Sequence, residues 1–353
     1  MHLSTFQKTA LGTVVAATSL LAFTGCSSGE PAGGSTTAIA GPVSLETACA
    51  AGAAEGEVNY WSTSDPDDFA EEIAPFEQEY PDITVNYTNI VPADATQQLI
   101  TELQAGHSLS ADAFTMDLAS AAPLLDAGVI ADFDYGALGI DESHVTAEGD
   151  VRMFRVFRDL IGIAYNPQTT SEADLPKSWD DLLDPKWKGK VIVDPRGVYV
   201  GGLGAAWGED EAVDWFGTFL DEAEPQVLMG STASLQAVES DQALLSTSAT
   251  ASAVLQQQAD GAPIDIAYLD VVTSQDKYGM LVSGAAHPNA AACFLGWWGG
   301  PEGQAQQLAV ELKANDDAPA DLPAGATLAF VTDPESQTVV TDTTVQLAEL
   351  MAQ

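Results

Sequence analysis

Short apolar runs alternate with helix-forming segments along residues 58–150. Phe69, Ile73 and Phe76 recur at the spacing of one helix face, and Leu99 and Leu103 lie four residues apart in a second such segment. The apolar runs between these segments have the length of buried strands. The pattern predicts strands over 58–61 and 83–87 and at 111–114, and helices over 69–80, 96–105 and 120–126.

The alternation continues beyond residue 157, where proline and glycine mark the ends of elements. An apolar strand stops at Asn166-Pro167 because proline cannot continue sheet pairing, and Ser178 precedes a short helix that Pro185 ends. Further strands are predicted over 191–193, 244–246 and 264–268, the last as the return strand. Helices are predicted near 201–207, over 210–220, from the turn 230–232 to about 239, over 251–259, and on either side of Gly299-Gly300-Pro301. This order favours mostly parallel sheets with helices on both faces, an α/β protein.

The first 25 residues have the pattern of a bacterial lipoprotein signal peptide. Lys8 precedes an apolar core over 11–23, and Phe23-Thr24-Gly25 leads to Cys26. Phe23 departs from the leucine usual at this position. A spanning anchor and a plain secretory peptide are alternatives, but the apolar run is short for a bilayer, which needs about 20 residues. We expect cleavage before Cys26, a diacylglycerol on its sulfur as the only membrane attachment, and a flexible small-residue tether over 26–44.

The chain carries a formal net charge of -41, and most of its eleven basic residues lie between 152 and 196. Such acidity excludes nucleic acid as a partner, because phosphates are repelled. The basic segment has two interpretations, a ligand or permease surface and a set of solvated side chains. If Cys26 is lipidated, Cys49 and Cys293 form an even pair, either as a disulfide or as two buried thiols.

Two tracts resemble family 1 extracellular solute-binding proteins. The first joins Gly162-Ile163-Ala164-Tyr165-Asn166-Pro167 to residues 175–190, which read LPKSWDDLLDPKWKGK; the second is the HPNAA tract from His287, with Pro301-Glu302-Gly303-Gln304 after it. The resemblance covers roughly 57–310. It implies a two-lobed periplasmic-binding-protein type 2 fold, each lobe a mostly parallel sheet flanked by helices. Residues 45–156 and 266–353 would form the first lobe with C-terminal helices, and 157–265 the second, with a hinge at about 157–165 and 264–270.

The resemblance also implies a monomeric, extracytoplasmic protein that captures a small solute between its lobes and delivers it to an ABC permease. The sequence holds no convincing catalytic set. Its histidines are scattered, and neither an HExxH motif nor a G-x-S-x-G elbow is present. We therefore predict a binding protein rather than an enzyme, without a cofactor. A ligand-sensing lipoprotein and an enzyme built on the same fold are the alternatives.

Polar turns that lead into helices supply the candidate binding residues. Helix N-termini present unpaired amides and a partial positive charge, and in α/β folds they lie at the carboxyl ends of strands, where ligands bind. Each residue has a second interpretation as a helix cap. The candidates are Ser62, Thr63, Ser64, Thr115, Asp117, Arg196, Tyr199, Ser231, Thr232 and Ser248.

Arg196 is the sharpest candidate because it follows a strand end in a strongly acidic chain. Its guanidinium can bind a carboxylate or phosphate in bidentate fashion, or form an ion pair with Asp194 instead. Tyr199 and Trp61 could stack on a ligand ring, and Trp61 could equally belong to the core.

The resemblance extends to ferric-ion carriers, which hold the metal with a neighbouring pair of tyrosines in the second lobe. The corresponding residues 246–254 contain no tyrosine. We therefore expect no metal site and an anionic organic or phosphorylated solute, with ferric ion and polyamines as alternatives.

Overall fold

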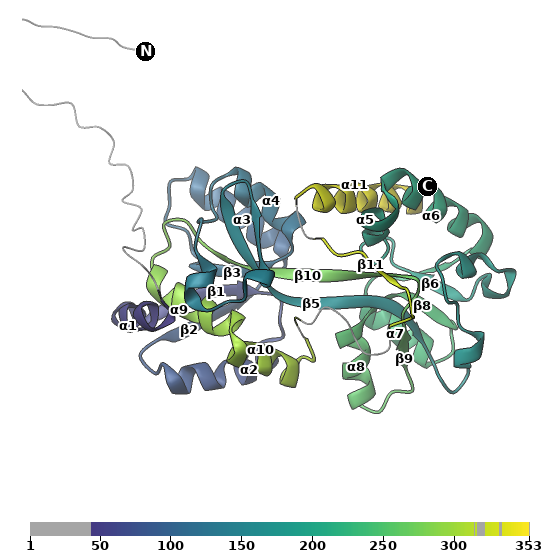
Figure 1. The fold of residues 1–353 in the computed structure, drawn as a ribbon, viewed down its shortest axis with the longest axis horizontal. Coiled ribbons are helices and arrows are strands. Elements are labelled where there is room, and N and C mark those ends of the chain that lie inside the picture. The colour runs from purple at the N-terminus through teal and green to yellow at the C-terminus, as the bar shows by residue number, and fades with distance from the viewer. Residues whose placement is uncertain (1–43, 314, 316–321, 332–333, 353) are drawn as a thin grey trace, which may run out of the picture. The chain divides into compact units, whose positions relative to one another are not determined.

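The computed structural model describes residues 44–313, 315, 322–331 and 334–352. The predicted signal peptide, Cys26 and all of the predicted tether except Ser44 lie outside these ranges. The described part forms two lobes joined by long strands (Figure 1). The strand order is β2-β1-β3-β10-β5-β8-β6-β7, so that β10 and β5 lie between the strands of the first lobe and those of the second.

The first lobe is built on a three-stranded parallel sheet, β2-β1-β3. Val58 and Tyr60 of β1 face a core that also contains Phe69 and Phe294, whereas Trp61 belongs to a separate core with Phe114. Successive strand residues point to opposite faces, so one strand serves both cores. Its elements are α1 (Leu45–Glu55), β1 (Glu57–Ser62), α2 (Pro66–Glu79), β2 (Thr84–Asn89), α3 (Pro92–Gln104), β3 (Ala113–Met116), α4 (Leu118–Asp126), α9 (Pro288–Gly299) and α10 (Pro301–Val310).

Two long strands connect the lobes. β5 (Val151–Tyr165) pairs with β10 (Val271–Leu281) from Phe154 to Ile161 and then continues into the second lobe, where it pairs with β8 and β9. β10 returns antiparallel to β5 and reaches β3 through Tyr278–Leu281, after a register shift between Lys277 and Tyr278. Short strands flank this pair: β4 (Val145–Glu148), β9 (Asp265–Ala267) and β11 (Thr327–Leu328).

The second lobe contains the parallel strands β8-β6-β7, with β8 antiparallel to β5. Its main core gathers Trp179, Trp187, Phe216 and Phe219, and the indole N–H of Trp179 donates to the carbonyl of Val271, 2.9 Å away. The α-helices and strands are β6 (Val191–Val193), α5 (Gly204–Trp207), α6 (Glu209–Ala223), β7 (Gln226–Val227), α7 (Ser231–Glu239), β8 (Leu245–Thr250) and α8 (Ala251–Ala259).

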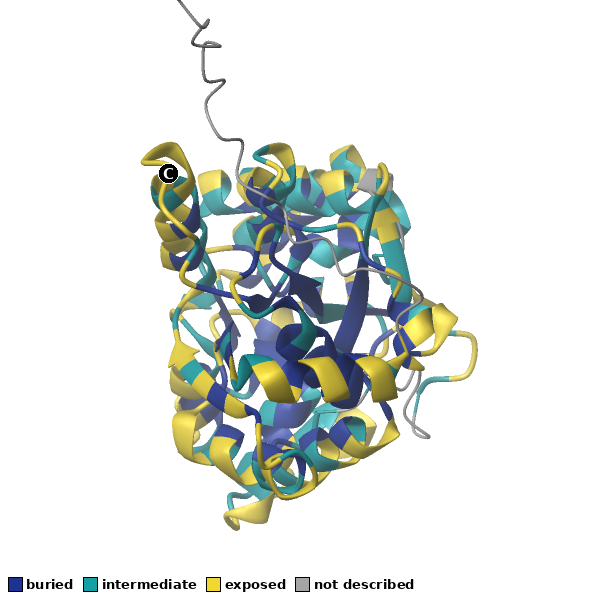
Figure 2. Ribbon diagram, turned by 90° about the vertical axis from the view of Figure 1, so that its left-hand side faces the viewer, coloured by how far each residue is buried: buried dark blue, intermediate teal, exposed yellow. Residues whose placement is uncertain are grey.

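Short 3₁₀ helices fill the connections. They are η1 (Tyr135–Leu138), η2 (Glu142–His144), η3 (Glu172–Asp174), η4 (Asp180–Leu183), η5 (Pro185–Trp187) and η6 (Gly201–Leu203). The central strands are largely buried, whereas exposed residues gather on the outer helices and connections (Figure 2).

The last helix, α11 (Pro334–Met351), packs against α5, α6 and η6 of the second lobe and also reaches α4 of the first. Gly201 and Gly204 allow this approach, because a Cβ at either would lie within 2.3 Å of the hydroxyl of Thr344 or Thr343. The final helix therefore belongs mainly to the second lobe, while α9 and α10 pack with α1 and α2 in the first.

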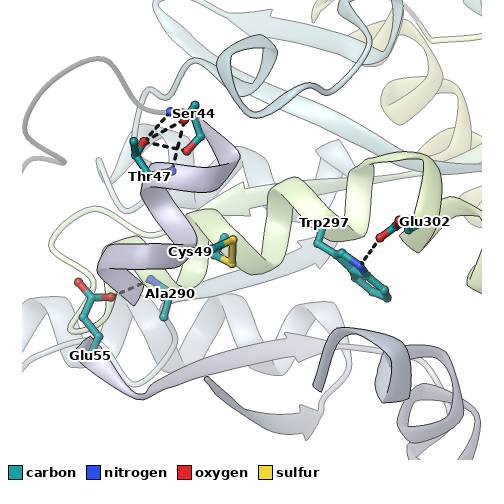
Figure 3. The surroundings of a disulfide bond; sticks show 8 residues. Ser44, Thr47, Cys49, Glu55, Ala290, Trp297 and Glu302 are labelled. Carbon is teal, nitrogen blue, oxygen red and sulfur yellow. Dashed lines mark hydrogen bonds between the residues drawn. A yellow bond between two sulfur atoms is a disulfide. The ribbon is translucent and has the colours of Figure 1, made fainter. Parts of the chain in front are cut away.

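A disulfide joins α1 to α9 through Cys49 and Cys293, 244 residues apart in sequence (Figure 3). Beside it, the Glu55 carboxylate accepts from the amide of Ala290 at 2.7 Å. Gly52 packs directly on the backbone of Ala290. The first described helix is thus fixed to a helix from late in the chain.

Most predicted elements agree with the structure to within a few residues, including the helix break at Gly300-Pro301. The return strand is the main difference. The predicted segment 264–268 is β9, which pairs with β5 inside the second lobe, and the true return is β10. The second crossing therefore follows the predicted 264–270 hinge. Helix α1 was not expected from the sequence.

Candidate anion-binding cavity

A cavity of about 560 Å³ lies between the lobes. Its walls come from the start of α3, the start of α4, the middle of β10, the turn after β6, and α11. Three of the residues predicted from the sequence line it: Asp117, Arg196 and Tyr199. Much of the remaining wall is apolar, as in Val91, Leu118 and Val340. The size and lining are those of a site for a small molecule.

Arg196 forms an ion pair with the buried carboxylate of Asp194, which is 1% exposed. One Asp194 oxygen accepts from the amide and Nε of Arg196, each at 2.9 Å, and the other accepts from Nη2 at 2.7 Å. The Gly230 amide also donates to Asp194, at 2.7 Å. Burial alone would raise the pKa of Asp194, but these donors outweigh it and hold the pKa below its usual value. The carboxylate therefore stays charged and fixes the guanidinium.

The ion pair between Arg196 and Asp194 is one of the two expected interpretations, and it leaves some N–H donors of the guanidinium unused. Arginine has five N–H donors, and this side-on pair uses only those of Nε and Nη2. The side chain of Arg196 remains 49% exposed. Tyr199 lies beside it and is nearly buried, and burial raises the pKa of its hydroxyl, which stays neutral. Arg196 also hydrogen-bonds to the Tyr199 side chain, and its half-exposed guanidinium lines the cavity, where it can contact an anion.

The first lobe contributes Asp117 and Lys277. Asp117 caps α4 by accepting from the Ser120 amide at 2.9 Å, and its other oxygen accepts from Lys277 Nζ at 3.0 Å. Burial would raise the pKa of Asp117, but Lys277 and Ser120 lower it below the usual value. A second carboxylate-backed cation thus faces the same cavity from β10.

Lys277 was missed by sequence reasoning. Only two basic residues follow Arg196 in the chain, Lys277 and Lys313, and this scarcity was the available signal. The contribution of α11 was also missed. Gln337, Thr341 and Thr344 line the cavity, although the last forty residues match the solute-binding pattern only loosely.

The polar turns predicted in the first lobe have other partners. The Thr115 hydroxyl accepts from Tyr60 Oη at 2.7 Å, and the Ser64 hydroxyl donates to Glu311 at 3.1 Å. Ser62 is buried and accepts from the amide of Ser64, while Thr63 is exposed. Trp61 belongs to the core. None of these residues lines the cavity as described.

The remaining second-lobe candidates lie at helix starts or in a strand. Ser231 and Thr232 begin α7, and the Ser231 amide lies against the Tyr199 hydroxyl. Ser248 is fully buried in β8. The hydroxyls of Ser231 and Ser248 have no hydrogen-bond partner among the described residues.

The segment without tyrosines ends β8 and begins α8. There the buried carboxylate of Asp159 accepts from the amide of Ser252 at 3.0 Å and from its hydroxyl. Burial raises the pKa of Asp159 above its usual value. Within the described ranges, no group of three or more histidine, cysteine, aspartate or glutamate side chains is arranged to hold a metal ion.

Several basic residues of the segment 152–196 form ion pairs within the protein. Arg152 bonds to Asp132 at 2.8 Å, Arg158 forms a buried pair with Asp276 at 2.7 Å, and Lys188 pairs with Glu224 at the surface. Much of the segment's charge therefore has a partner inside the chain.

No helix in the described ranges combines the length and the apolarity that crossing a bilayer requires.

Residues 71–315 match the family of bacterial extracellular solute-binding proteins. This chain belongs to that family. A relative from Haemophilus influenzae, named only as an uncharacterized protein, is 28% identical over 163 residues, which cover 42% of this chain. The match spans 45% of that relative's length.

Two solved structures share the fold. Iron-bound HitA from Pseudomonas aeruginosa is 18% identical with a TM-score of 0.68, over 83% of this chain and 99% of that one. AfuA from Actinobacillus pleuropneumoniae, with fructose-6-phosphate bound, is 17% identical with a TM-score of 0.62, over 83% and 97%. The predicted α/β, two-lobed type 2 binding-protein fold is confirmed. The family is one of extracellular solute-binding proteins, in agreement with the predicted class of binding protein.

Proposed function

We propose that this protein is the lipid-anchored substrate-binding component of an ABC importer, and that it captures a small anionic organic or phosphorylated solute between Arg196 and Lys277. One observation carries the choice of solute. Two cations, one from the turn after β6 and one from β10, face the same cavity, and each is held by its own carboxylate.

Preorganisation explains why these two cations favour an anion despite the overall charge of -41. Distant acidic side chains are screened within about 10 Å at 0.1 M salt, whereas Arg196 and Lys277 act at contact distance. The guanidinium is already oriented by Asp194, so little rotamer entropy is lost when a carboxylate or phosphate binds its outer edge. The apolar wall accommodates the body of the solute.

Closure of the lobes about β5 and β10 would bury the solute and present a surface that a permease recognises. The lipid on Cys26 would keep the protein beside that permease. Metabolic labelling with palmitate tests the anchor. Labelled protein is expected from the natural chain and not from Cys26→Ala, and equal labelling of both would contradict the assignment.

Thermal unfolding of the full-length protein in detergent tests the solute class. The panel is phosphonates, sugar phosphates, organic acids, thiamine, polyamines and ferric citrate. A ligand at a hundred times its Kd adds about 2.7 kcal/mol of stability, which raises the Tm measurably. Stabilisation by one anionic class supports the proposal, and stabilisation by ferric ion or polyamine alone contradicts it.

Variants then locate the site. Arg196→Ala and Lys277→Ala are each expected to weaken binding of the anion at least tenfold, about 1.4 kcal/mol. Lys188→Ala is the matched control, because Lys188 forms an exposed pair with Glu224, which does not line the cavity. Unchanged affinity in both cavity variants would exclude this site.

A further inference from the structure

Two valines in the wall of the cavity are exposed. Val91 directly precedes α3 of the first lobe and is 55% exposed, and Val345 lies on α11 and is 53% exposed. Eight large apolar side chains are exposed in the described part of the chain, and these two line one cavity from different elements. Exposed apolar surface that gathers in a hollow is typical of a binding groove.

Further apolar side chains extend this wall within the cavity. Leu118 comes from α4 of the first lobe, Val198 from the turn after β6, and Val340 from α11. Helices α4 and α11 contact each other, so the apolar wall includes parts of both lobes. A solute body placed against it is removed from water on two sides, and the burial of its carbon surface favours binding.

The polar side chains that α11 adds to the wall bond within their own helix. Gln337 Nε2 donates to the Thr341 hydroxyl at 3.0 Å, and the Thr344 hydroxyl donates to the carbonyl of Val340 at 2.7 Å. A solute rich in hydroxyl groups must find a partner for each hydroxyl that it buries, because an unpaired one weakens binding. This part of the wall therefore fits carbon surface better than a sugar.

The charges of the cavity are confined to a few pairs. Asp276, which is 9% exposed, accepts from Arg158 Nη2 at 2.7 Å, and Tyr278 beside it bonds to the same carboxylate. Asp117 is paired with Lys277 in the same way. Both carboxylates that line the cavity are thus engaged by a cation, whereas Arg196 and Lys277 provide the attraction for an anionic group.

Resting on the solute-capture function proposed above, we propose that the solute is an amphipathic anion. It has a carboxylate or phosphonate head that binds Arg196 and Lys277, and an apolar body of several carbons that packs on the valines. Val91 and Val345 determine this specificity, since they present carbon surface from α3 and from α11. Sugar phosphates and other polyhydroxylated anions are poor ligands, although they carry a suitable charge.

Calorimetric titration of the full-length protein in detergent tests the proposal. Two homologous series are used, n-alkylphosphonates from methyl to pentyl and n-alkylcarboxylates from acetate to hexanoate, and titration into detergent alone gives the blank. Each buried methylene is expected to lower the Kd about fourfold, which corresponds to about 0.8 kcal/mol. We expect the longest member of at least one series to bind ten times or more as tightly as the shortest, and as tightly relative to fructose 6-phosphate.

Variants of the exposed valines locate the apolar contact without disturbing the core. Val91→Ala and Val345→Ala are each expected to weaken the longest member at least threefold and to leave the shortest within twofold. Val227→Ala is the matched control, because Val227 on β7 is 52% exposed and does not line the cavity. Its affinities should equal those of the natural chain.

The outcomes separate this proposal from the capture function. Affinity that does not change with chain length but falls in Arg196→Ala would overturn the amphipathic solute and leave anion capture in place. The same holds if fructose 6-phosphate binds more tightly than every alkyl anion. If no anion binds, both proposals fail. A chain-length dependence that Val91→Ala and Val345→Ala leave unchanged would overturn the role of the two valines.

Discussion

Removal of the disulfide between Cys49 and Cys293 gives the prediction with the most direct magnitude. The bond closes a loop of 244 residues. The chain-entropy relation for such a loop gives about 5.5 kcal/mol at 25 °C, and native disulfides commonly contribute about 2–5 kcal/mol when removed. Because both cysteines are buried, Cys49→Ala with Cys293→Ala keeps apolar groups in place and removes mainly the cross-link.

The assay is thermal and urea unfolding of the natural chain and the double variant, with and without reductant. With an unfolding entropy of about 2.1 cal/mol/K per residue over roughly 310 residues, a loss of 2–5.5 kcal/mol lowers the Tm by about 3–8 °C. Reductant should lower the natural chain to the same value and leave the double variant unchanged.

Helix α1 is expected to remain docked without the bond, because Glu55 still accepts from the amides of α9 and Gly52 still contacts Ala290. Two results would refute the reasoning. One is a difference below about 1 kcal/mol between the two proteins. The other is full alkylation of both cysteines in the unreduced, denatured natural chain.

Three further predictions concern Glu72, Gly201 and Asp276. The folded-state pKa of Glu72, about 8, lies above its ordinary value of 4.5, so the free energy of unfolding should fall as pH rises from about 4.5 to 8. In Tm measured across that range, Glu72→Gln should flatten this dependence, and parallel curves for the variant and the natural chain would contradict the prediction. Gly201→Ala places a Cβ about 2.0 Å from the Thr344 hydroxyl, so amide hydrogen exchange in 334–351 should accelerate and the free energy of unfolding should fall by about 1–3 kcal/mol. Exchange rates equal to those of the natural chain would show that α11 shifts to accommodate the methyl group. Asp276→Asn leaves the buried Arg158 without its charge partner and should cost about 3–5 kcal/mol in urea unfolding, and a cost below about 1 kcal/mol would mean that Arg158 finds another partner.

The strand and helix pattern of both lobes could be predicted from sequence because it depends on local periodicity. Phe69, Ile73 and Phe76, for example, all fall on the buried face of α2. Helix α1 was missed because alanine and glycine give it no apolar stripe, and its position depends on α9. β10 was missed because Ser274, Gln275 and Asp276 interrupt its apolar pattern.

The candidate site was only half predictable for a similar reason. Asp117, Arg196 and Tyr199 follow strand ends, where local sequence indicates a binding position. Lys277 lies in the middle of a strand, and α11 arrives at the cavity through contacts with η6 and α5 that no local pattern reveals. Ser64 had the right local features but its hydroxyl is engaged by Glu311, far away in sequence.

The wall that α11 gives to the cavity affects the order of events during biosynthesis. Gln337, Thr341 and Val345 lie in the cavity wall, so a nascent chain has no complete binding site until these residues have been made. A ligand stabilises only a folded state that contains its binding site, and the added stability grows with the logarithm of ligand concentration. Ligand-linked stability is therefore gained only after α11 has been synthesised, as one of the last steps in making the chain.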